Sequence, residues 1–147
     1  MESGELEQCF GAAYRATRYV VPSLALALRI GATHADLDAV LQRHGVRSWA
    51  FVSACNPYSA AQLCAHENLA RHQNLIDVVR QSGWVCFEGA GEPRGGDWAA
   101  EPSLLILGIA RGDAMALGER FEQNAVVFGD MGGVAELLWC RPASRSG

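Results

Sequence analysis

The stretch SWAFVSACNPYSAAQLCAHEN, residues 48–68, joins an apolar run to a segment with helical periodicity. Its first part, residues 48–55, has the short, apolar composition of a buried strand. Asn56 and Pro57 end that strand, because both residue types favour turns. A helix is then predicted over residues 59–82, ending before Gly83. This strand-turn-helix unit is the start of the predicted fold.

The elements that follow extend this unit to the order β-α-β-β-α-β. Further strands are predicted over residues 84–87, 103–109 and 125–128, and a second helix over residues 111–122. This order is the ferredoxin-like split βαβ pattern, with two helices on one face of a mainly antiparallel sheet. The predicted fold class is therefore α+β with a ferredoxin-like core.

Additional elements are predicted on both sides of this core. Residues 14–21 are β-rich and end at Pro22, which favours a strand at an edge of the sheet. The run LALALRI, residues 24–30, fits either a helix or a strand, and Thr33 begins a helix that ends before Gly45. A last strand is predicted over residues 134–139. The polar tail, residues 141–147, is expected to fray.

Length and composition restrict the class of protein. The 147 residues fit a single domain, and the 50% hydrophobic and 19% charged content indicates a globular chain. A net charge of -4 disfavours a nucleic-acid partner. The five cysteines form no CxxC pair, which favours reduced thiols and a cytoplasmic location, and no apolar run is long enough to span a membrane. Homo-oligomerisation stays open.

Chain direction brings polar side chains from separate segments to one end of the predicted sheet. The members of this group are Asn56, Ser59, Glu101, Ser103, Gln123 and Asn124. Such a set can orient a small polar ligand, and the predicted helix start at Ser59 adds backbone donors suited to an anion. Glu101 is the candidate general acid or base of the group.

Three further residues are candidates for the same end of the molecule. The glycine-rich segment 88–100 is interpreted as a loop over this end, with Arg94 as an anion contact and Trp98 as a ring that stacks on a ligand. Asn68 is a polar residue on the helical stripe that faces the sheet, so it needs hydrogen-bond partners. Structural alternatives stay open: the loop with Arg94 as a disordered turn, Trp98 as a core side chain, and Asn68 as a hydrogen-bond partner of a neighbouring loop.

Several short motifs resemble a bacterial family, domain of unknown function 3293. They are NPYS (residues 56–59) with Asn68 downstream, Trp98, Glu101, Ser103, FEQNA (residues 121–125) and the opening AYRATRYVV (residues 13–21). The resemblance covers residues 13–139 and implies a small single-domain protein. Its pattern falls on Asn56, Pro57, Ser59, Asn68, Glu101, Ser103, Gln123 and Asn124. Ser53 stands where we expect threonine, and Cys55 where other side chains are usual, which disfavours a cysteine nucleophile.

Metal and cofactor chemistry are not expected. Cys64 and His72 share one predicted helix, but two ligands without a second pair elsewhere indicate no metal site. Cys55 fits an inert buried thiol. Two functions therefore stay open. One is binding of a small polar or anionic metabolite, with acid–base chemistry by Glu101. The alternative is a non-enzymatic interaction or regulatory module, whose polar group is a structural hydrogen-bond network.

Overall fold

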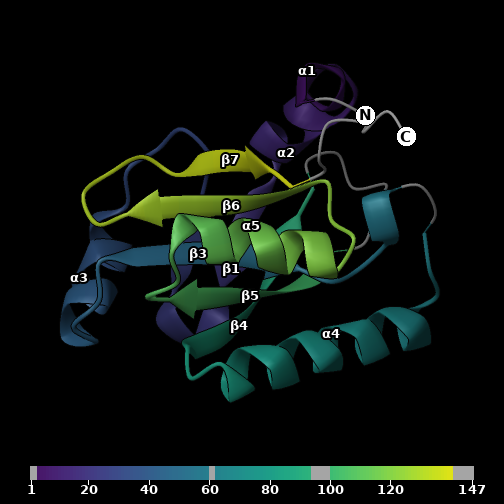
Figure 1. Ribbon diagram of the computed structural model, residues 1–147. Helices are drawn as coiled ribbons and strands as arrows, with labels where there is room; N and C mark the ends of the chain where they lie inside the picture. The colour runs from purple at the N-terminus through teal and green to yellow at the C-terminus, as the bar shows by residue number, and fades with distance from the viewer. Residues whose placement is uncertain (1–2, 60–61, 94–99, 141–147) are drawn as a thin grey trace.

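The computed structural model describes residues 3–59, 62–93 and 100–140. Within these residues seven strands form one antiparallel sheet with the order β2-β1-β4-β5-β3-β6-β7 (Figure 1). The strands are β1 (Arg18–Val21), β2 (Leu26–Leu28), β3 (Ser48–Ser53), β4 (Val85–Glu92), β5 (Glu101–Leu107), β6 (Ala125–Asp130) and β7 (Glu136–Trp139). The α-helices are α1 (Ser3–Leu6), α2 (Ala12–Ala16), α3 (Ala35–Arg43), α4 (Ala65–Gln81) and α5 (Arg111–Arg120). The predicted α+β class is confirmed.

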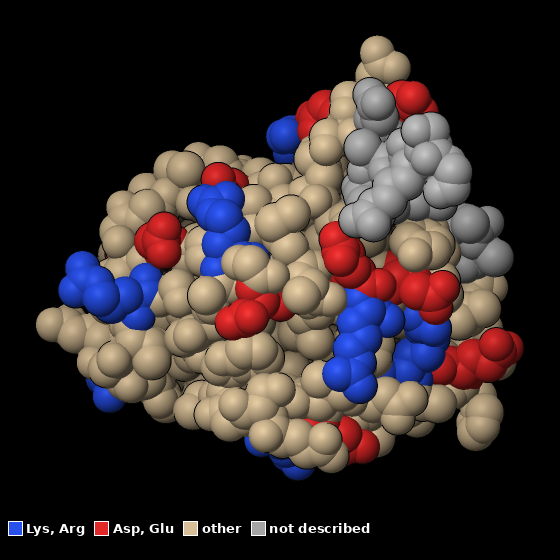
Figure 2. All heavy atoms as spheres, viewed as in Figure 1, with Lys and Arg blue, Asp and Glu red and all other residues tan. Residues whose placement is uncertain are grey.

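Helices α4 and α5 cover one face of the sheet (Figure 1). Successive residues of a strand point to opposite faces, so Ala50 and Val52 of β3 pack on this side. Helix α4 contributes Leu75 and Val79 to the same core, and α5 contributes Leu117. This apolar layer fixes α4 and α5 against the central strands. On the same side of the molecule, acidic and basic side chains are interspersed over the surface (Figure 2).

The opposite face of the sheet encloses a second core. Trp49 and Phe51 of β3 pack there with Leu41 of α3 and with residues of β1 and β2. The sheet curls around this core, because the segments beside its two edge strands are hydrogen-bonded. Gly31 N donates to Ala135 O at 2.7 Å, and Ala135 N donates to Ala32 O at 2.9 Å.

The N-terminal helical segment, residues 3–16, consists of α1, the π-helical turn η1 (Glu7–Gly11) and α2. Its Tyr14 ring lies edge-on against Trp139 of β7, with ring centroids 5.8 Å apart. On the other side, the Tyr19 hydroxyl of β1 donates to Tyr14 O at 2.8 Å. The segment is therefore attached to both sides of the curled sheet. No helix of residues 3–59, 62–93 and 100–140 combines the length and apolarity that a membrane span requires.

The predicted helix start at Ser59 is wrong. Residues Pro57–Ser59 form a short 3-10 turn, η3, and α4 begins at Ala65. Tyr58 and Ser59 have left-handed φ values of 54° and 55°, which an α-helix of L-residues does not continue through. Tyr58 N instead donates to Glu122 O at 2.6 Å. A long-range bond therefore overrides the local helical pattern, and Ser59 does not cap α4.

Two strand predictions also need correction. Residues Ala12–Ala16 are helical, so β1 starts at Arg18, and β1 lies between β2 and β4 instead of at an edge. The segment predicted as a loop from residue 88 continues as strand β4 to Glu92, because it pairs with β1 on one side and β5 on the other. The ambiguous run 24–30 contains β2.

Candidate functional site

A pocket of about 500 Å³ lies between the N-terminal helical segment and the sheet face that is turned away from α4 and α5. We call it the Glu101 pocket. Its walls carry aromatic side chains: Phe10, Tyr14, Tyr19 and Phe51. Its floor consists of small residues from four strands: Gly91, Ser103, Ser53 and Ala125.

Strand register explains why this part of the sheet is hollow. Ser53 pairs with Ser103, so two small residues face each other on β3 and β5, and Gly91 of β4, which pairs with Glu101, lies two residues along from this pair. Two residues before Ser53, on the same face of β3, the large side chain of Phe51 fills the space. The pocket is the unfilled continuation of the second core.

Glu101 contributes the one charged side chain among the described residues that line this pocket. Ser53 Oγ donates to its Oε1 at 2.9 Å, and Asn56 Nδ2 donates to its Oε2 at 3.0 Å. Both donors are neutral, and in the part of the chain that the structure describes no basic side chain forms an ion pair with this carboxylate. Glu101 is thus a half-buried carboxylate held in one orientation without a counter-charge.

Asn56 is in turn fixed by Asn68 of α4. Asn68 Oδ1 accepts the Asn56 backbone N–H at 3.0 Å, and Asn68 Nδ2 donates to Asn56 Oδ1 at 2.9 Å. Leu63 N also donates to Asn56 Oδ1, at 2.8 Å. Asn56 has a left-handed φ of 48°, a conformation that asparagine tolerates better than most residues. Asn68 therefore acts on the pocket through Asn56.

Gln123 and Asn124 hold the same turn from the other side. Gln123 Nε2 donates to Cys55 O at 3.0 Å, and Asn124 Nδ2 donates to Tyr58 O at 2.9 Å. Gln123 lines the pocket, whereas Asn124 is not among its lining residues. Asn124 Oδ1 is buried and has no hydrogen-bond partner within the described residues. These amides connect the turn after β3 to the start of β6.

The structure thus brings five of the predicted site residues into one pocket: Asn56, Ser59, Glu101, Ser103 and Gln123. Asn68 and Asn124 lie behind it. Arg94 and Trp98 fall outside the residues that the structure describes. The predicted backbone donors of a helix start at Ser59 are replaced by the turn η3.

Sequence reasoning missed the wall formed by residues 10–19. Phe10, Tyr14 and Thr17 have the i, i+4, i+7 spacing of one helical face. The β-rich composition of residues 14–21 concealed that signal. Burial raises the pKa of Tyr14 to about 12; side-chain hydrogen bonds with Ser59 and Asn124 oppose this shift, and the negative charge of Glu101 adds to it. The hydroxyl therefore stays protonated at neutral pH.

The cysteines and the histidine that the sequence singled out lie in separate environments. Cys55 is buried, and desolvation raises its thiol pKa to about 11, so it does not supply a thiolate at neutral pH. Cys64 Sγ lies 3.2 Å from Glu67 Oε1, while His72 Nε2 lies 3.1 Å from Glu88 Oε1. No cluster of three or more metal-binding side chains occurs in the described ranges.

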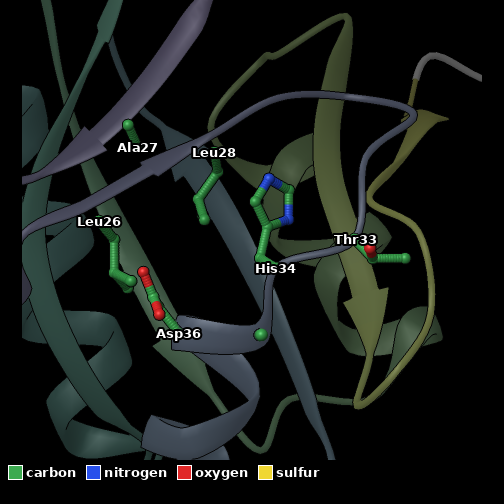
Figure 3. A pocket seen from close by; sticks show the side chains of 7 residues that line it. Leu26, Ala27, Leu28, Thr33, His34 and Asp36 are labelled. Carbon is green, nitrogen blue, oxygen red and sulfur yellow. The ribbon is translucent and has the colours of Figure 1, made fainter.

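A smaller hollow of about 230 Å³ lies between β2 and the start of α3 (Figure 3). Its polar side chains are Thr33, His34 and Asp36. His34 Nε2 already accepts the Arg29 backbone N–H at 3.1 Å, and partial burial lowers the pKa of His34. This hollow is the weaker candidate because its imidazole is committed to the backbone.

Comparison with known proteins places the chain in a family. The model of the family described as "Protein of unknown function (DUF3293)" matches residues 52–126, slightly more than half of the chain. This range includes Ser53, Asn56, Glu101 and Gln123 of the pocket. Neither the curated proteins nor the solved structures contain a match. The resemblance seen in the sequence motifs is confirmed, and the chain belongs to the DUF3293 family.

Proposed function

We propose that this protein binds a small polar organic molecule in the Glu101 pocket. The observation that carries the proposal is the carboxylate of Glu101, which two neutral donors orient within a largely apolar pocket. Ligand sites commonly combine apolar and aromatic walls with a few convergent polar groups, and volumes of roughly 300–1,000 Å³ are usual. The pocket volume of about 500 Å³ is in this range.

Of the two ligand classes suggested by the sequence, polar and anionic, the geometry favours the polar one. The charge contributed by the described lining residues is negative. The helix start that would attract an anion lies at Ala65 and not at Ser59. An anion at this place would be repelled by Glu101 without compensation from a helix dipole.

Acid–base chemistry is part of the proposal only through Glu101. Its carboxylate faces the pocket and can accept a proton from a bound molecule. The Tyr14 hydroxyl, which stays protonated at neutral pH, is a neutral hydrogen-bond donor on the same pocket.

The competing proposal is an interaction module. The hydrogen bonds of Asn56, Asn68 and Asn124 with backbone groups support it, because such a network can also serve stability alone.

We also propose that β3-α4-β4-β5-α5-β6 is a ferredoxin-like unit. The strand order β4-β5-β3-β6, the antiparallel pairing and the position of α4 and α5 on one face support this assignment. Strands β1, β2 and β7 then extend the unit at both edges. The N-terminal extension supplies the pocket wall.

A blocked pocket tests ligand binding. Ala12 and Ala13 of α2 are both exposed, but only Ala13 is among the residues that line the pocket. A thermal-shift screen of amines, nucleosides and amino acids should yield a compound that stabilises the wild type and Ala12→Phe but not Ala13→Phe. The proposal fails if no compound stabilises the wild type, or if every active compound stabilises both variants equally.

A further inference from the structure

We infer that the ligand of the Glu101 pocket is a primary amine that carries its ammonium group on a flat apolar body, an inference that rests on the proposed function. The first reason is the unmatched charge of Glu101. A carboxylate offers about four acceptor positions, and the described contacts to its oxygens come from two neutral donors, Ser53 and Asn56. A partly buried carboxylate of this kind is stabilised by a cation that also donates hydrogen bonds.

Within the described ranges, the basic side chains on elements next to the pocket are already committed to other partners. Three arginines on neighbouring elements pair with other glutamates: Arg15 with Glu7, Arg18 with Glu92 and Arg71 with Glu122. Arg71 also donates to the backbone oxygens of Ala54 and Phe121. These side chains would have to leave their partners to reach Glu101. A ligand is the simpler source of the missing positive charge.

The other residues that line the pocket indicate the shape and polarity of the rest of the ligand. Next to the carboxylate, Gly91 adds no side chain to the floor, and a Cβ there would be in ordinary contact with Thr17 Cγ2 at 3.5 Å and Tyr19 at 3.9 Å, so the ammonium position lies between Glu101 and these side chains. Aromatic rings surround this space, and Tyr19 and Phe51 already meet edge to face with centroids 5.3 Å apart. Such walls favour a planar apolar body and also attract cations. The geometry therefore combines an ammonium position with an aromatic slot.

Three probes of similar shape and different charge test this inference. Tyramine carries an ammonium group, 4-ethylphenol is neutral, and 4-hydroxyphenylacetate carries a carboxylate. Their dissociation constants are measured by calorimetry on the wild type, Glu101→Gln and the control Glu119→Gln, which removes an exposed charge from α5 on the other side of the sheet. Melting temperatures recorded alongside check that each variant is folded.

Tyramine is expected to bind the wild type and Glu119→Gln equally, and Glu101→Gln about tenfold or more weakly, because one charged hydrogen bond is lost. The affinity of 4-ethylphenol should not differ between the three proteins. The inference is overturned if tyramine does not bind, if Glu101→Gln binds it as the wild type does, or if 4-hydroxyphenylacetate binds best. When one of these results is obtained and another compound binds the wild type but not Ala13→Phe, the inference of an amine ligand is refuted while the proposed pocket function stands.

Discussion

Replacing Asn68 by alanine should destabilise the protein through the turn that carries Asn56. Asn68 forms one hydrogen bond with the Asn56 backbone at 3.0 Å and one with the Asn56 side chain at 2.9 Å. The alanine side chain has no polar atom that could replace either hydrogen bond. The substitution therefore removes both and leaves the Asn56 N–H, which lies in a partly buried turn, without its acceptor.

The magnitude follows from these contacts. Two hydrogen bonds contribute about 1 kcal/mol each, and an unpaired partly buried donor adds about 1 kcal/mol or more. Alanine is the better helix former, which returns up to roughly 0.7 kcal/mol within α4. The expected net loss in the free energy of unfolding is about 2–3 kcal/mol.

Asn74→Ala is the matched control, since Asn74 is exposed on the same helix. This variant should change the free energy of unfolding by less than about 0.5 kcal/mol or raise it slightly. Urea denaturation followed by circular dichroism measures both variants, with equal m-values as a check. A loss for Asn68→Ala that lies within about 0.5 kcal/mol of the control would refute the structural role of this pair.

Three further outcomes are expected. Gly118→Ala should lower the free energy of unfolding by about 1–3 kcal/mol, because a Cβ there would lie 2.8 Å from Val126 Cγ1. Gly112→Ala on the same helix places its Cβ where no atom lies within 4 Å, so this variant should be neutral or slightly stabilising. Urea denaturation compares the two variants. Thiol alkylation of the folded protein at neutral pH should modify exposed Cys64 and leave buried Cys55 intact, as mass spectrometry of peptides would report. Burial raises the pKa of the Cys55 thiol from 9.0 to about 11, so its contribution to stability is complete below pH 9 and is lost as pH rises to about 11. Between these pH values the free energy of unfolding should therefore fall less in Cys55→Ala than in the wild type, as denaturation at each pH would measure.

The central strands were predictable because their signals are local. The apolar residues of β3 and β5 alternate between two buried faces, so each segment reads as a continuous apolar run in the sequence. The glycines of β4 have no such signal. Gly91 is a strand residue because β1 and β5 pair with β4 on both sides, which no short window of sequence contains.

The polar side of the pocket was also predictable, because strand direction decides which ends meet. Asn56, Glu101 and Gln123 follow or precede neighbouring strands and do lie around one pocket. The conformation of the turn was not predictable. Tyr58 takes its left-handed φ of 54° where its N–H bonds to Glu122 O, a residue far along the chain.

The aromatic wall could not be predicted for a different reason. It depends on the curl of the sheet, which the bonds of Gly31 and Ala32 with Ala135 maintain across its two edges. It also depends on helical structure at Tyr14, where the sequence favours a strand. Both are tertiary effects that compete with local propensity and prevail.

Binding of an amine in the Glu101 pocket can be followed residue by residue. The most direct test is a titration of isotope-labelled protein with tyramine, followed by amide chemical shifts in nuclear magnetic resonance spectra. Bound tyramine should cause the largest shifts at the floor of the pocket, at Ser53, Gly91 and Ser103, and these shifts should be lost in Glu101→Gln. Shifts confined to the hollow around His34, or no shifts at saturating tyramine, would contradict it.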